Sequence, residues 1–109
     1  MSLSKNHVSL IGRAGANPEI VEFANGNKLA KLSLAIQERI YSPAGVKATV
    51  NWHNIVAWGK KAEQMEQFIE KGQLLVVEGK LRNKLENRNG VPTHISEILC
   101  SHFMMLNRK

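Results

Sequence analysis

This chain is short of several residue types, and each shortage excludes a class of protein. Cys100 is the only cysteine among 109 residues, so no disulfide can form within the chain and a reducing compartment fits. Its apolar neighbours predict a small buried hydrophobe rather than a reactive thiol. No apolar run approaches the roughly 20 residues of a membrane-spanning helix, and the N-terminus lacks the apolar segment of a signal peptide. We therefore expect a cytoplasmic protein with one domain over residues 1–109.

Aspartate is missing altogether, because all nine acidic residues are glutamate. Lysine and arginine together number 15, which leaves a formal charge of +6. Residues 60–71 hold three lysines and three glutamates and are neutral, so the excess lies in the rest of the chain. Such an excess predicts a polyanionic partner, either nucleic acid or an acidic membrane surface.

Catalytic and metal-binding motifs are also lacking. The chain has no Gly-rich phosphate loop and no G-x-S-x-G nucleophile motif, so we expect no enzyme. His94 and His102 flank Cys100 at a spacing that matches none of the usual zinc sites, and no second cluster exists. We therefore expect neither a metal nor a cofactor, and we interpret His53 as a structural or subunit-contact residue.

Apolar alternation predicts an all-β fold. A first strand over residues 7–12 is interrupted near Gly12 and Gly15, which permit a bend, and it resumes over residues 19–23. The Asn25-Gly26 and Asn89-Gly90 pairs predict hairpin turns. The remaining strands are expected at residues 28–37, 49–58, 73–81 and 93–106. Residues 38–48 are predicted to be a long mobile loop and residues 82–90 a flexible polar tip.

One helix is expected over residues 60–71, with Ala62, Met65, Phe68 and Ile69 on its apolar face and Gly72 as its C-terminal cap. With the bent first strand counted once, the order is β-β-β-α-β-β. This order is typical of the OB-fold, a five-stranded Greek-key barrel with one helix between its third and fourth strands.

The two tryptophans are the strongest functional signal. Trp52 and Trp58 are six residues apart, so strand alternation places them on one face with Asn54, while His53, Ile55 and Ala57 take the other. Two tryptophans on one face can simply belong to a core. The opposite face, however, already supplies core residues, and lysines follow Trp58 directly. Aromatic platforms beside positive charge are typical of proteins that bind single-stranded nucleic acid.

Basic residues complete the candidate binding surface. The polar tip is either a solvated hairpin end or a basic finger that closes over nucleic acid. Tyr41 is a further residue suited to stacking. The candidate nucleic-acid-binding residues are Trp52, Trp58, Lys60, Lys71, Arg82, Lys84, Arg88, Tyr41, Asn54 and Lys5.

An ordered set of motifs resembles a known family. The set comprises Val8-Ser-Leu-Ile-Gly-Arg13, Asn17-Pro-Glu19, Asn25-Gly26, Leu34-Ala35, Trp52-His53, Trp58-Gly-Lys-Lys-Ala-Glu63, Lys71-Gly72, Val77-Glu-Gly-Lys-Leu81 and Met105-Leu106. In this order and spacing the chain resembles the bacterial-type single-stranded DNA-binding protein (SSB) family over about residues 6–106. The resemblance implies that Trp52 and Trp58 stack on bases, and that Lys60, Lys71 and Arg82 fall on positions that are commonly basic.

Two departures from the family pattern bear on function. Two further stacking aromatics of the family are replaced: Ile40 or Tyr41 stands near one position and Leu85 near the other. Family members also typically continue through a linker to an acidic tip that recruits replication and repair enzymes, whereas this chain stops at Asn107-Arg-Lys109. The expectation is therefore an OB-fold domain without the acidic tail, and tail-mediated recruitment is not expected.

We expect a protein that binds single-stranded DNA largely without sequence preference and protects it in replication, recombination and repair, in the cytoplasm on the nucleoid. The resemblance implies a homo-oligomer, most often a tetramer, although a dimer is possible. One alternative is a replication-restart accessory that resembles primosomal protein B. The other is a protein-interaction OB module that has lost DNA binding and buries its tryptophans in a subunit interface.

Overall fold

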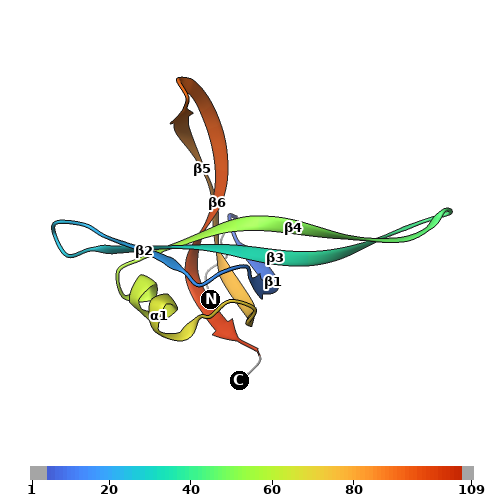
Figure 1. The fold of residues 1–109 in the computed structure, drawn as a ribbon, viewed down its shortest axis with the longest axis horizontal. Coiled ribbons are helices and arrows are strands. Elements are labelled where there is room, and N and C mark those ends of the chain that lie inside the picture. The colour runs from blue at the N-terminus through green and yellow to red at the C-terminus, as the bar shows by residue number, and fades with distance from the viewer. Residues whose placement is uncertain (1–4, 107–109) are drawn as a thin grey trace.

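The computed structural model describes residues 5–106 and shows a barrel from which long hairpins project (Figure 1). The strands are β1 (Val8–Ala14), β2 (Glu19–Glu22), β3 (Lys28–Ser42), β4 (Gly45–Trp58), β5 (Leu74–Arg88) and β6 (Val91–Met105), and the helix is α1 (Lys60–Phe68). The expectation about the C-terminal tail concerns residues 107–109, which lie outside the described residues. None of the described helices is long and apolar enough to cross a membrane.

The barrel closes through the first strand. The sheet order is β1-β5-β6-β4-β3-β2, and β1 also pairs with β3 where Arg13 faces Ala35. A Cβ on Gly12 would lie 2.5 Å from the carbonyl oxygen of Ala35, so glycine permits the close approach at this crossing. β2 continues the path of β1 along β3, which confirms the five-stranded barrel with one helix between its third and fourth strands.

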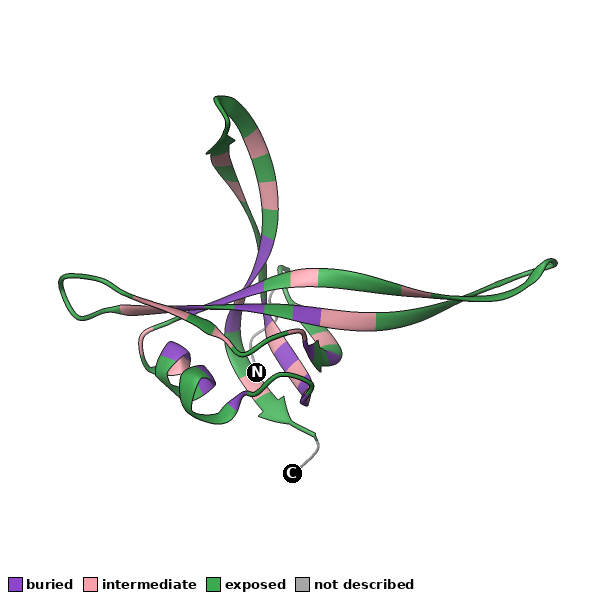
Figure 2. Ribbon diagram, viewed as in Figure 1, coloured by how far each residue is buried: buried purple, intermediate pink, exposed green. Residues whose placement is uncertain are grey.

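The core lies where the strands cross, as the buried residues at the centre of Figure 2 show. Alternate residues of β3 and β4 point inward, and Leu34 and Ile55 are fully buried. Ala62, Met65 and Ile69 from α1 and the segment after it close one end of the barrel. Cys100 belongs to this core, as expected, and burial raises the pKa of its thiol.

Residues 38–48 do not form the predicted mobile loop, and that prediction is wrong. They extend β3 and β4 into a regular hairpin, with register pairs from Glu38 opposite Thr49 to Ser42 opposite Gly45. Gly45 has φ +125°, which only glycine adopts readily, and its carbonyl oxygen accepts a hydrogen bond from the Ser42 hydroxyl. Most side chains of this segment are exposed, so it lacks the one-sided apolar pattern by which a strand is recognised.

The predicted flexible tip at residues 82–90 is likewise strand. β5 and β6 pair from Arg82 opposite Glu97 to Arg88 opposite Val91. Asn89 and Gly90 both have positive φ values, 53° and 79°, which confirms the predicted turn. The Asn25-Gly26 turn between β2 and β3 is confirmed as well, with Gly26 at φ +88°.

The helix is shorter than predicted. It ends at Phe68, and Ile69 is its C-cap in an extended conformation, so Gly72 belongs to the following turn instead. Phe68 is 47% exposed and does not join the core, contrary to the expected apolar face. Ile69 is buried instead, because the helix ends at the residue before it and the chain then turns toward β5.

Candidate nucleic-acid interface

The two tryptophans lie on the outer face of β4, as predicted. Trp52 is 61% exposed and Trp58 is 45% exposed, whereas Ile55 and Ala57 on the opposite face are fully buried. His53 is on the same face as Ile55 and Ala57 and is half-buried. Val56 shares the outer face but is covered. The face between the rings therefore presents Asn54 to solvent.

Tyr41 lies on the same face at the far end of the hairpin. It pairs with Val46, which precedes Trp52 by six residues on β4. Strand alternation then puts aromatic rings on this face at three positions, each about 20 Å from the next at the usual rise per residue. Tyr41 is 73% exposed and lies in β3, next to its last residue, rather than in a loop.

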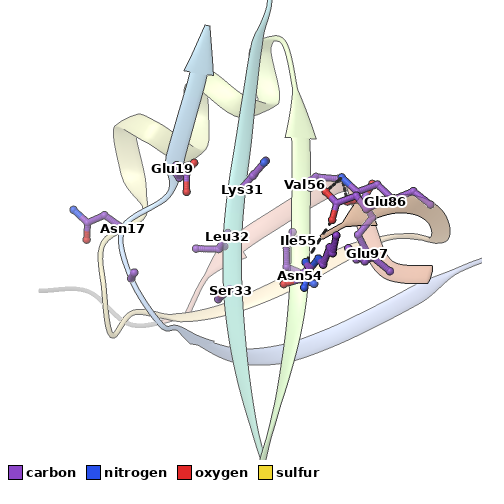
Figure 3. A pocket seen from close by; sticks show the side chains of 14 residues that line it. Asn17, Glu19, Lys31, Leu32, Ser33, Asn54, Ile55, Val56, Glu86 and Glu97 are labelled. Carbon is purple, nitrogen blue, oxygen red and sulfur yellow. Dashed lines mark hydrogen bonds and ion pairs between the residues drawn. The ribbon is translucent and has the colours of Figure 1, made fainter. Parts of the chain in front are cut away.

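A cleft of about 310 Å³ opens over the outer face of β3 and β4 beside the β5–β6 hairpin (Figure 3). Its floor includes Ser33 and Asn54, which are opposite each other in the strand register. Among the charged side chains that line it are three cations and three carboxylates: Lys31, Lys84, Arg88, Glu19, Glu86 and Glu97. The cleft is therefore close to neutral rather than positive.

Carboxylates hold the cations of the β5–β6 hairpin. The Glu97 side chain is 5% exposed, and its oxygens lie 2.8 Å from Arg82 Nη2 and 3.6 Å from Lys84 Nζ. Glu86 pairs with Lys84 at 3.6 Å and with Arg88 at 3.4 Å, and these side chains are all well exposed. Exposed pairs contribute little stability and can be exchanged for a phosphate, whereas a buried carboxylate left without its cation is costly.

Each indole rests on a contact from a distant segment. Phe23 stacks on Trp58 with ring centroids 5.6 Å apart and planes 20° apart. A Cβ on Gly15 would lie 2.4 Å from Cζ3 of Trp52, so this indole lies directly over the glycine backbone. Both tryptophans are thereby fixed on one side while much of each ring stays open.

The remaining candidate residues lie away from the cleft. Lys60 begins α1, just after Trp58, and Lys71 lies in the turn before β5, where its backbone N–H donates to Asn17 Oδ1 at 2.8 Å. Lys5 precedes β1 beside Asn6, whose side-chain amide makes two hydrogen bonds of 2.9 Å with the backbone of Leu81. All three lysines are exposed, and none lines the cleft.

Sequence reasoning missed three residues of this surface: Phe23, Lys31 and Glu97. The alternation of β3 was available as a signal for Lys31, because odd positions of that strand share the face of Trp52 and Trp58. Phe23 and Glu97 act through contacts with distant strands, and no local pattern marks such contacts. Within residues 5–106, no group of three or more histidine, cysteine or glutamate side chains is placed to hold a metal.

The profile of the Single-strand binding protein family matches residues 5–106. The chain belongs to this family. Single-stranded DNA-binding protein 1 of Chlorobaculum tepidum is 35% identical over 112 residues, which cover 100% of this chain and 69% of that protein. Single-stranded DNA-binding protein 1 of Streptococcus pyogenes is 34% identical over 104 residues, covering 95% of this chain and 79% of that protein.

Solved structures agree with this family assignment. The Plasmodium falciparum SSB in complex with ssDNA superposes with a TM-score of 0.86 at 29% identity, covering 98% of this chain and 99% of that one. A deletion mutant of the Thermus aquaticus single-stranded DNA-binding protein gives 0.81 at 27% identity, covering 94% of this chain and 50% of that one. The OB-fold prediction and the resemblance are both confirmed.

Proposed function

We propose that this SSB-family protein binds single-stranded DNA largely without sequence preference and protects it during replication, recombination and repair. The observation that carries the proposal is the pair of exposed indoles on one face of β4. Every base has a π-face on which an indole can stack, so such a surface accepts any sequence. Nothing favours the replication-restart or protein-interaction alternatives over this function. We assign the chain no catalytic step, and we place it in the cytoplasm on the nucleoid.

The predicted residues have different roles in the proposed binding surface. Trp52, Trp58 and Tyr41 supply stacking platforms, and Asn54 offers an amide to a base edge between the tryptophans. Glu86 competes with phosphates for Arg88 and Lys84, whereas Arg82 stays with the buried carboxylate of Glu97 because leaving that group unpaired is costly. Lys60, Lys71 and Lys5 are exposed cations outside the near-neutral cleft and attract the strand over a longer distance.

Alanine substitution of each tryptophan tests the platform assignment. Trp52→Ala and Trp58→Ala should each weaken oligo(dT) binding by about 1–3 kcal/mol, the usual worth of one stacked base. Because both rings are largely exposed, the free energy of unfolding should fall by less than the 3–5 kcal/mol typical of a buried tryptophan. Fluorescence anisotropy of labelled oligo(dT) and thermal unfolding measure the two effects.

Phe68→Ala is the matched control for these variants. Phe68 is an aromatic residue of similar exposure, at 47%, but it lies on α1 rather than on the outer face of β4. It should bind oligo(dT) as the wild type does. If the tryptophan variants lose melting stability but keep wild-type affinity in the folded fraction, the rings are structural and the proposed surface is wrong.

We further propose that the chain is a homo-oligomer, a tetramer by family likeness, and that all 109 residues form one DNA-binding domain. The support is an apolar row across three neighbouring strands on the side away from the core: Ile11 faces Val76, and Val76 faces Met104. Ile11 and Met104 are 57% and 54% exposed. Ile11→Glu should dissociate the oligomer at tens of micromolar in light scattering, whereas Val91→Glu, at a hairpin tip, should not.

A further inference from the structure

Phe23, which follows β2, and Trp58, which ends β4, form an aromatic pair across β3. Their centroid distance of 5.6 Å and interplanar angle of 20° describe an offset stack. Phe23 is 41% exposed and Trp58 is 45% exposed, so the pair lies at the surface rather than in the core. Because both rings stay partly exposed to solvent, we look for a functional role of this stack in addition to its contribution to stability.

The backbone under both rings is fixed before any ligand arrives. The Phe23 N–H donates to the Asn27 carbonyl oxygen at 2.8 Å, and the Gly26 N–H donates to the Phe23 carbonyl oxygen at 2.9 Å. On the other side, Trp58 faces Leu29 in the register, and the Gly59 N–H donates to the Lys28 carbonyl oxygen at 2.9 Å. The same β2–β3 hairpin therefore sets the position of both rings.

Building on the proposed function, we propose that Phe23 is a positioning residue for DNA binding. It occupies one face of the Trp58 indole and orients the opposite face for a base. The two rings are already in stacking contact, so a base cannot enter between them without separating them. Phe23 acts through Trp58 and does not itself hold the strand.

Positioning of this kind raises affinity by reducing the entropy that binding must remove. A free tryptophan side chain on a surface samples several rotamers, and ordering one such side chain costs affinity. An indole that is already packed on Phe23 has lost most of that freedom during folding. Loss of the Phe23 ring should therefore weaken binding about two- to tenfold, the range expected for one aromatic contact or one ordered side chain.

A double-mutant cycle tests the proposal with Phe23→Leu, Trp58→Leu and the double variant. Leucine keeps apolar bulk and removes the stacking ring. Phe23→Leu should weaken oligo(dT) binding two- to tenfold with an unchanged salt dependence, because no charge is altered. In the Trp58→Leu background the same change should have no effect. An equal loss in both backgrounds would mean that Phe23 contacts the strand directly, and it would overturn the proposal.

Fluorescence reports on the orientation of the indole itself. In a Trp52→Phe background Trp58 is the only tryptophan, so its emission can be excited selectively over that of Tyr41. Oligo(dT) should quench this emission less when residue 23 is changed from Phe to Leu. Phe23→Tyr keeps a stacking ring and should bind as the wild type does. A loss in Phe23→Tyr as large as that in Phe23→Leu would contradict the stacking role.

The outcomes separate this inference from the proposed function. If Trp58→Leu binds oligo(dT) as the wild type does, Trp58 is not a platform and the proposed surface fails with it. If Trp58→Leu weakens binding and Phe23→Leu does not, the proposed function stands and only the positioning role of Phe23 is overturned. Thermal unfolding of each variant confirms that the proteins compared are folded.

Discussion

Removing one carboxylate from the β5–β6 hairpin should make DNA binding tighter and more dependent on salt. Glu86 pairs with both Lys84 and Arg88, and all three side chains are substantially exposed. In Glu86→Gln both cations lose this partner without any loss of packing, and Lys84 keeps only its 3.6 Å pair with Glu97. We therefore expect at least one of them to neutralise a phosphate that it does not neutralise in the wild type.

The magnitude follows from counterion release. Each phosphate neutralised on a single strand steepens the slope of log affinity against log salt by about 0.7. One additional contact therefore strengthens binding about eightfold at 50 mM salt and about threefold at 200 mM, relative to 1 M salt. Because exposed ion pairs contribute little stability, the melting temperature should change only slightly.

The assay is a fluorescence titration with oligo(dT) at four or more salt concentrations. Glu66→Gln is the matched control, because it makes the same change of charge on α1, where Glu66 pairs with Lys28 at 3.2 Å away from the cleft. If Glu86→Gln and Glu66→Gln give equal slopes, the effect is one of net charge alone. If neither slope differs from the wild type, the hairpin cations do not contact phosphate and this reasoning is refuted.

Two further predictions follow from contacts in the barrel. Gly15→Ala should displace the Trp52 indole, because the new Cβ would lie 2.4 Å from Cζ3. The variant should therefore bind oligo(dT) more weakly and show a shifted tryptophan emission while the barrel stays folded. Wild-type emission and affinity would show that Gly15 does not hold the ring. Because burial raises its pKa, the thiol of Cys100 should form less thiolate than a free cysteine at pH 8 and react slowly with a thiol reagent until the protein is denatured. The same shift means that the thiol stabilises the fold below the ordinary thiol pKa and that this contribution is lost as the pH rises through the raised value, which thermal unfolding against pH can follow.

The barrel could be predicted from the sequence because its signals are local. Strand alternation placed Trp52 and Trp58 on one face and Ile55 on the other, and the two Asn-Gly turns fixed where hairpins close. The outer halves of the hairpins were missed because residues such as Glu38 and Arg39 are solvated on both faces and leave no apolar pattern. What holds them is backbone pairing, which composition does not record.

The charge of the proposed binding surface could not be read from the sequence in the same way. Arg82, Lys84 and Arg88 counted as three free cations, but their pairing with Glu86 and Glu97 depends on the register between β5 and β6. The stack of Phe23 on Trp58 likewise joins segments that only the folded barrel brings together. Local patterns thus predicted which side chains share the outer face of β4, whereas the electrostatics of that face and its fixed side chains required the tertiary structure.

The length of the β3–β4 hairpin can change without loss of core packing. Its outer part contributes no buried residue to the barrel, and its strands are in regular antiparallel register (Figure 2). Insertion of two residues into each strand would keep the outer side chains on their present faces, whereas insertion of one would turn each of them to the opposite face. The reach of this arm can therefore evolve, or be engineered, in steps of residue pairs. A reporter group at Ala44, in the turn that ends this hairpin, would then lie at a distance from the barrel that is set by the number of inserted pairs.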